Sequence, residues 1–222
     1  QKGAGREGGF GLNIRLPFEQ RANEVIDGDP KLVNFNYFFT RKLTFLKETH
    51  AVALFPGGFG TMDEGFEALT LMQTGKSHIF PLVLLDRPGG TYWHTWHKFI
   101  GEYLLALGLV SRDDFHLYKI AGSVEDAVRE ITGFYRNYHS SRWVGDRLVI
   151  RLRQALAEDV PAVLSRDFGD VLREGVIRQA EPLVEESGAH PGLARLVLQP
   201  HRHNFGRIRL LIDRINSAPI AT

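Results

Sequence analysis

Short apolar runs and helical patterns alternate along the first 140 residues of the chain. The apolar runs cover residues 10–16, 51–55, 79–85 and 117–121. The run at 79–85 is nearly continuous, which is typical of a parallel strand covered on both faces. Helical patterns follow at residues 92–107 and 123–138, the second with Ser123 as its N-cap. Strands that alternate with helices predict an α/β fold built on a parallel sheet.

Residues 32–48 carry apolar side chains at a spacing that predicts one helix. These side chains are Leu32, Phe35, Phe38, Phe39, Leu43 and Leu46. We expect the aromatic residues among them to lie in the core. The charged pair Arg41 and Lys42 should emerge in part from the same helix.

The pattern changes from about Ser140 onward. Strands are predicted at residues 147–153, 175–180 and 193–199, with a helix at 159–172 and a final helix that Asn204 caps. This order predicts a small α+β extension. We therefore divide the chain into residues 1–140 and 141–222. The extension offers a dimerisation surface, a regulatory ligand site or a simple cover for the sheet.

Composition narrows the classes of protein to which the chain can belong. The 222 residues are 43% hydrophobic and carry a formal net charge of +1, so no global field attracts nucleic acid or an anionic membrane. Cysteine is absent, which excludes disulfides and thiolate chemistry. No apolar run approaches the ~20 residues of a membrane span. We expect a globular cytoplasmic protein that binds neither nucleic acid nor membrane.

The most informative motif is PGGFGTMDE at residues 56–64, directly after the apolar run 51–55. Glycines at a strand-to-helix turn let an anion approach the unpaired N–H groups of the helix N-terminus. A structural interpretation is also open, because Thr61 and Glu64 match the spacing of a capping box. The dinucleotide fingerprint and the P-loop both fail on spacing, since Asp63 and Thr70 occupy positions where they require glycine.

These residues resemble the LOG family, whose members have also been labelled lysine decarboxylases and carry P-G-G-x-G-T-x-x-E preceded by an Arg-Lys pair. Here that pair is Arg41-Lys42. The resemblance covers about residues 9–135 and also includes residues 11–14, 16–20, 38–42 and 73–76. It implies a Rossmann-like nucleotide-binding fold, usually dimeric, that hydrolyses the N-glycosidic bond of nucleoside 5′-monophosphates.

The resemblance also implies roles for particular residues. Glu64 and Arg41 correspond to the catalytic positions of the family. The substrate-binding positions that we expect are Gly57, Gly58, Gly60, Thr61, Lys42, Asp63 and Glu19. The substrate would be a small-molecule nucleoside monophosphate, and the protein a homodimer.

The family has two further strand–helix units before the part that this sequence covers, which opens at Gln1. The second of those units carries a glycine-rich loop that helps to hold the nucleotide. The sequence begins beyond both units, so we expect a Rossmann-like domain that lacks its N-terminal units and this phosphate loop.

Two functions from different classes stay open at this point. The first is a nucleoside-monophosphate glycosidase, which the presence of both Arg41 and Glu64 favours. The second is a non-hydrolytic binder or carrier of a nucleotide or nucleotide cofactor, which would need the glycine turn but not that pair. The base that would be released is not readable from the sequence, so cytokinin-type adenines, the plain adenine of AMP and other bases all stay open.

No cofactor or metal is expected. The pairs His94/His97 and His201/His203 have no third ligand at a diagnostic spacing. A pyridoxal phosphate enzyme would need a lysine for the Schiff base, and no motif marks Lys42 or Lys76 for that role.

Overall fold

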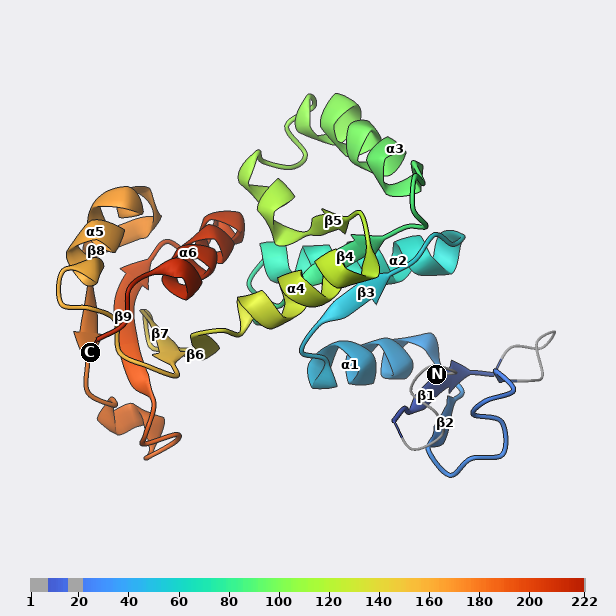
Figure 1. Ribbon diagram of the computed structural model, residues 1–222, viewed down its shortest axis with the longest axis horizontal. Coiled ribbons are helices and arrows are strands. Elements are labelled where there is room, and N and C mark those ends of the chain that lie inside the picture. The colour runs from blue at the N-terminus through green and yellow to red at the C-terminus, as the bar shows by residue number, and fades with distance from the viewer. Residues whose placement is uncertain (1–7, 16–21, 222) are drawn as a thin grey trace. The chain divides into compact units, whose positions relative to one another are not determined.

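The computed structural model describes residues 8–15 and 22–221 (Figure 1). The chain divides into two compact units, one of residues 1–49 and one of residues 50–222. The fold is mixed α/β, with parallel strands that alternate with helices and an antiparallel sheet toward the C-terminus. The α/β class predicted from the sequence is confirmed.

The first unit contains two parallel strands and one helix. Strand β1 (Gly11–Ile14) pairs in register with β2 (Leu32–Phe35), and helix α1 (Phe38–Glu48) follows. The prediction of a single helix over 32–48 was therefore wrong at its start, because residues 32–35 form a strand. A stretch of four residues is too short for its apolar spacing to distinguish a helix from a strand. Pairing with β1 makes residues 32–35 a strand.

Helix α1 buries less apolar surface within the described residues than the sequence suggested. Leu46 is buried, whereas Phe38, Phe39 and Leu43 are 52%, 69% and 67% exposed. The expectation that these aromatic residues belong to the core was wrong. Because β2 takes up the first part of the pattern, the remaining 11-residue helix turns only its C-terminal Leu46 inward.

The second unit begins with three parallel strands in the order β3-β4-β5, which are Val52–Leu54, Leu82–Leu85 and Lys119–Ala121. Helix α2 (Phe59–Gln73) connects β3 to β4. Helix α3 (Tyr92–Phe99) continues as a π-helix (Ile100–Leu105). A 3-10 helix (Asp113–Leu117) then leads into β5, and α4 (Val124–Phe134) follows it.

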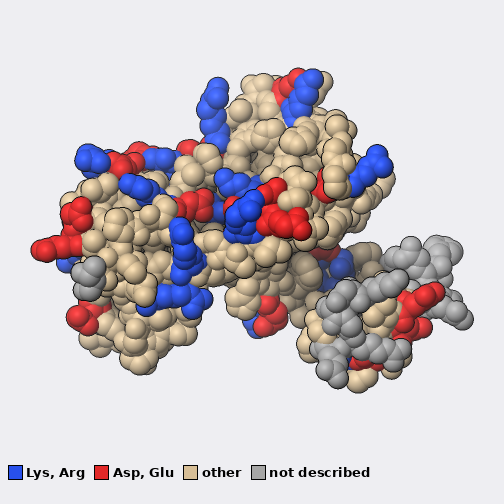
Figure 2. Space-filling view, in the orientation of Figure 1, with Lys and Arg blue, Asp and Glu red and all other residues tan. Residues whose placement is uncertain are grey.

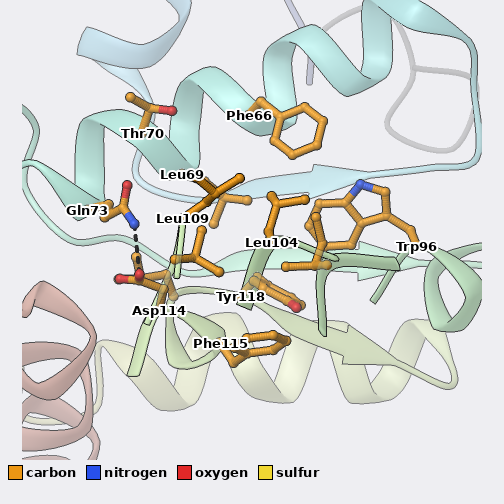
Figure 3. Close-up of a pocket in the computed structure, with 13 residues that line it drawn as sticks. Phe66, Leu69, Thr70, Gln73, Trp96, Leu104, Leu109, Asp114, Phe115 and Tyr118 are labelled. Atoms are coloured by element: carbon orange, nitrogen blue, oxygen red, sulfur yellow. Dashed lines mark hydrogen bonds between the residues drawn. The ribbon is translucent and has the colours of Figure 1, made fainter. Parts of the chain in front are cut away.

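Side chains alternate across the buried strand β4 and so reach both layers of helices. Val83 and Leu85 pack with Ala127 of α4, so Leu82 and Leu84 point to the other face. On the α2 side, a Cβ added to Gly65 would lie 2.9 Å from a methyl group of Leu54. Helix and strand thus approach closely at Gly65. Figure 3 shows α2 and α4 on opposite sides of these strands.

The C-terminal part forms a four-stranded antiparallel sheet in the order β6-β7-β9-β8. Its elements are β6 (Tyr138–Val144), β7 (Arg147–Leu152), α5 (Val160–Asp167), β8 (Leu172–Ala180), β9 (Ala194–Pro200) and α6 (Phe205–Ser217). The predicted strands and helices of this part are all present, and the Asn204 side chain caps α6 by accepting a hydrogen bond from the Arg207 N–H (3.3 Å). Strand β6 was missed, because the helix predicted to reach Tyr138 ends at Phe134.

Helix α6 joins this sheet to the parallel strands. It contacts α2, α4 and the 3-10 helix on one side and β6 on the other. The Asn216 side chain accepts hydrogen bonds from the N–H groups of Asn137 (2.9 Å) and Tyr138 (2.8 Å) and donates one to the carbonyl of Phe134 (2.6 Å). Asn216 therefore satisfies the backbone at the turn from α4 into β6.

Helix α6 also carries a buried charge. The Arg209 side chain is 1% exposed, pairs with Glu130 of α4 and donates to Asp213 (3.1 Å). Burial raises the pKa of Asp213, which Arg209 opposes. Within the described part of the chain, no helix is long and apolar enough to cross a bilayer.

Candidate functional site

The carboxyl ends of β3, β4 and β5 share one edge of the sheet, and each is followed by a helix N-terminus. In open α/β sheets, ligands bind at this edge. Helices α2, α3 and α4 all start there and direct their N-terminal dipoles toward it. The edge is therefore suited to an anion.

Helix α2 begins earlier than a capping box would require. Its N-cap is Gly58, in extended conformation (φ −88°, ψ −153°), and no side chain caps it. The N–H groups of Thr61 and Met62 donate to the Gly58 carbonyl (3.1 and 3.2 Å). Because Thr61 lies inside the helix, Thr61 and Glu64 do not form a capping box, and the structural interpretation of this pair is wrong.

The three glycines of the turn differ in what surrounds them. A Cβ on Gly57 would lie 2.2 Å from the Thr61 hydroxyl oxygen, so the Thr61 side chain folds back against the turn. A Cβ on Gly58 or Gly60 would meet nothing within 4 Å. Gly57 is thus required by the fold, whereas Gly58 and Gly60 border open space in front of the helix N-terminus.

Helix α2 presents the candidate catalytic side chain on the same face as this open turn. Gly60 and Glu64 are four residues apart, and Thr61 and Glu64 are three apart, so all three share one face. Thr61 and Glu64 are half-buried, whereas Asp63 is exposed. Glu67, one turn further along the Glu64 face, is half-buried and was not singled out from the sequence.

A second loop, which the sequence analysis missed, contacts the glycine turn. After β4, the Asp86 carboxylate accepts hydrogen bonds from the N–H groups of Arg87 (2.7 Å) and Tyr92 (3.1 Å). The Tyr92 hydroxyl donates to the Gly57 carbonyl. A Cβ on Gly90 would lie 2.2 Å from the Asp86 carboxylate, which explains a glycine there. The position of Asp86 at a strand end was the available signal.

The first turn of α4, at the same edge, differs from that of α2. The Ser123 hydroxyl accepts a hydrogen bond from the Asp126 N–H (3.0 Å), as predicted, and Glu125 and Asp126 lie in the first turn. Helix α2 has neither a side-chain cap nor an acidic residue in its first turn. Of these two N-termini, only that of α2 leaves its positive end for an external anion.

The remaining predicted site residues belong to the first unit. Arg41 and Lys42 lie half-buried in α1, where the Arg41 N–H donates to the Tyr37 carbonyl (3.3 Å). Glu19 falls outside the described residues. The structure therefore brings together the glycine turn, Thr61 and Glu64, and it places Arg41 and Lys42 in the other unit.

An apolar pocket of about 240 Å³ lies on the opposite side of α2 (Figure 3). Phe66 and Leu69 of α2 face Trp96, Leu104 and Tyr118 across it. The Gln73 side-chain amide donates to the Asp114 carboxylate (2.7 Å) at one end of the pocket. These α2 residues point away from the Gly60–Glu64 face, so the apolar pocket is separate from the glycine turn.

The candidate histidine pairs have local partners. The Nδ1 atom of His97 lies 2.7 Å from the Tyr118 hydroxyl, whose pKa is raised by burial. The rings of His201 and His203 lie 5.0 Å apart. Across the described ranges 8–15 and 22–221, no group of three or more His, Cys, Asp or Glu side chains is arranged to hold a metal.

Comparison with protein families gives one match, which covers more than half of the chain. The model of the family described as "possible lysine decarboxylase" matches residues 1–131. The chain belongs to this family, which is also the LOG family. Comparison with curated proteins finds no match. The family resemblance predicted from PGGFGTMDE and Arg41-Lys42 is confirmed.

The two lysines considered for a Schiff base lie in different parts of the chain. Lys76 follows the C-terminal end of α2, on the connection that leads to the amino end of β4. That position is at the opposite end of the strands from the glycine turn. Lys42 lies in α1, in the first unit.

Proposed function

We propose that the protein hydrolyses the N-glycosidic bond of a nucleoside 5′-monophosphate and releases a free base and ribose 5-phosphate. The observation that carries the proposal is the shared face of α2, on which the open turn at Gly60, the Thr61 hydroxyl and the Glu64 carboxylate lie together. Membership in the LOG family, a family of phosphoribohydrolases, supports it.

The 5′-phosphate would bind at the uncapped N-terminus of α2. Backbone N–H groups at Gly58 and Gly60, the Thr61 hydroxyl and the helix dipole supply the attraction. The Thr61 N–H already donates to the Gly58 carbonyl, so Thr61 would contribute its hydroxyl to phosphate binding. Phosphate binding would set the register of the ribose along α2.

Glu64 would act on the ribose. Cleavage of an N-glycosidic bond passes through an oxocarbenium-like sugar, and a nearby carboxylate stabilises the positive charge that develops. Glu64 lies about one and a half turns from the first residue of α2. Its carboxylate would therefore lie further along the helix than the bound phosphate. It would also orient the attacking water.

The first unit would supply the other charged groups. Arg41 would contact the phosphate or the leaving base through its guanidinium, and Lys42 would add positive charge. Asp63 and Glu19 remain proposed substrate contacts, and we also propose a homodimer.

The test is a panel of nucleoside 5′-monophosphates and the matching nucleosides, with release of free base followed by chromatography. The chain is assayed alone and with the N-terminal strand–helix units of its family joined ahead of Gln1. Base release from monophosphates but not from nucleosides is the expected result, and it identifies the base. Binding of a monophosphate without release would contradict hydrolysis and support a carrier instead.

A further inference from the structure

A second pocket of about 620 Å³ lies at the amino edge of the parallel strands, opposite the glycine turn. His50 comes just before β3 and His78 just before β4. The facing wall is formed by the start of β6, with Tyr138 and Ser141, and by Arg153 at the end of β7. The volume is within the range of roughly 300–1,000 Å³ that is typical of small-molecule sites.

The lining of this pocket has one sign of charge. Arg153 is cationic, and His50, His78 and His139 become cationic on protonation. The other described residues of the lining are the hydroxyl side chains Tyr135, Tyr138, Ser140 and Ser141, and none of the described lining residues is acidic. Such a lining attracts an anion and supplies it with hydrogen-bond donors.

Hydrogen bonds hold the walls of the pocket in place. The Tyr135 hydroxyl donates to the backbone carbonyl of His50 (2.6 Å), and the Arg153 Nε donates to the carbonyl of Tyr135 (3.0 Å). This last hydrogen bond orients the Arg153 guanidinium through Nε. The Nη1 and Nη2 groups supply its other hydrogen-bond donors. The pocket is therefore formed before any ligand binds.

A buried charge cluster behind β6 adds to the positive potential. Glu186 is fully buried between Arg151 (2.7 Å) and Arg195 (3.1 Å), so two guanidinium groups share one carboxylate. Arg151 also donates to the hydroxyl of Ser140, which lines the pocket (3.4 Å). The cluster keeps a net charge of +1 next to the pocket wall.

The pKa of His139 is affected by the same positive charges. Burial lowers its pKa, and the positive charges of His190, Arg153 and Arg151 lower it further. The rings of His139 and His190 lie 5.0 Å apart. An anion in the pocket would offset this repulsion and favour the protonated imidazole.

We propose that the amino-edge pocket, defined by His50, His78, His139 and Arg153, binds a phosphorylated small molecule at a site separate from the glycine turn. Cationic and hydroxyl donors in a pocket of this volume suit a phosphate ester or a pyrophosphate. Because the C-terminal sheet forms one wall, this site gives the extension a ligand-binding role.

Inorganic pyrophosphate is a suitable probe, because it has no glycosidic bond and its binding does not depend on the proposed hydrolysis. Binding is measured by calorimetry, and the histidine ring resonances are followed by NMR during the titration. We expect the resonances of His50, His78 and His139 to move. Arg153→Ala should weaken binding at least tenfold, while base release in the absence of pyrophosphate stays unchanged.

Two further variants guard against effects on folding. In H50A/H78A the backbone carbonyl of His50 still accepts the Tyr135 hydroxyl, so the wall persists while two cationic rings are removed. Arg166→Ala is the matched control, because it removes an equally charged but exposed side chain on α5. Gly58→Ala at the glycine turn should leave the three histidine shifts intact.

Two results would overturn the site. One is pyrophosphate binding that is equal in Arg153→Ala, H50A/H78A and Arg166→Ala. The other is a titration in which none of the three histidine resonances moves. Shifts that vanish in Gly58→Ala would assign pyrophosphate to the carboxyl edge instead. Failure of the hydrolysis proposal would leave the calorimetric and NMR measurements unaffected and would remove only the comparison of base release.

Discussion

The two edges of the β3-β4-β5 sheet offer polar groups of different kinds. At the carboxyl edge the donors belong to the backbone, at Gly58 and Gly60 of an uncapped helix. At the amino edge they belong to side chains, which come from four separate segments of the chain. Backbone donors are fixed by the local turn, whereas a side-chain pocket depends on how distant segments pack. The two edges should therefore respond differently to substitution.

The largest expected effect is at the carboxyl edge. Glu64→Gln should lower kcat by about three orders of magnitude and leave nucleotide binding nearly unchanged, because the carboxylate acts mainly in the transition state. Single-turnover kinetics and calorimetry measure the two quantities. Glu125→Gln, at an exposed acidic residue in the first turn of α4, is the matched control. Equal activity of Glu64→Gln and the parent would remove Glu64 from the mechanism.

The next effect concerns the charge cluster behind the amino edge. Glu186→Gln leaves Arg151 and Arg195 buried without their carboxylate, which should cost about 3 kcal/mol of unfolding free energy in a urea titration at pH 7. Glu185→Gln, at the exposed neighbour that pairs with Arg147, should hardly move the midpoint. Similar midpoints for both variants would show that the ion pairs of Glu186 with Arg151 and Arg195 do not stabilise the fold measurably.

The pH dependence of the stability that the Glu186 cluster contributes follows from the direction in which the pKa of Glu186 is shifted. Burial alone would raise the pKa of Glu186, but hydrogen bonds from Arg151 and Arg195 hold it below its ordinary value of 4.5. The stabilisation is therefore complete above pH 4.5 and is lost as the pH falls through the lower folded value. Glu186→Gln should lose this part of the acid dependence of the unfolding midpoint.

A smaller effect separates binding from folding at the glycine turn. Gly58→Ala should weaken binding of a nucleoside monophosphate about tenfold, because the methyl group fills the open space in front of the helix N-terminus. The unfolding free energy should fall by no more than about 1 kcal/mol, because Gly58 is the N-cap of α2 but a Cβ there meets no protein atom within 4 Å. Gly133→Ala, at another open position, is the control. Unchanged binding would place the phosphate elsewhere.

The smallest effect contrasts two helix starts within the carboxyl edge. Ser123→Ala removes the cap of α4 and should lower the unfolding free energy by about 1 kcal/mol, with no effect on nucleotide binding. Chemical denaturation and calorimetry measure both. A loss of binding would mean that α4 also contributes to the anion site.

Local signals in the sequence were sufficient for much of the fold and for the glycine turn. The apolar run 79–85 and the caps Ser123 and Asn204 each encode an element within a few residues. The start of α2 was not readable, because Gly58 caps it without a side-chain signal and Thr61-x-x-Glu64 imitates a cap three residues later. Strand β6 was missed because its sequence, YHSSRWV, has mostly polar residues that pairing with β7 places in a sheet.

The amino-edge pocket could not be predicted at all. His50, His78, His139 and Arg153 lie in four segments, and no spacing along the chain relates them. Their proximity depends on the packing of the C-terminal sheet against the parallel strands. Tyr92 and its contact with Gly57 were missed for the same reason, since the two residues are 35 positions apart.

The Asn216 side chain has a consequence for the order of events on the ribosome. It satisfies the N–H groups of Asn137 and Tyr138, which are synthesised 79 and 78 residues earlier. At a synthesis rate of roughly 5–20 residues per second, Asn216 is added about 4–16 seconds after those two residues. The growing chain therefore completes the start of β6 only after α6 has emerged, so the pocket wall that begins at Tyr138 matures late in synthesis.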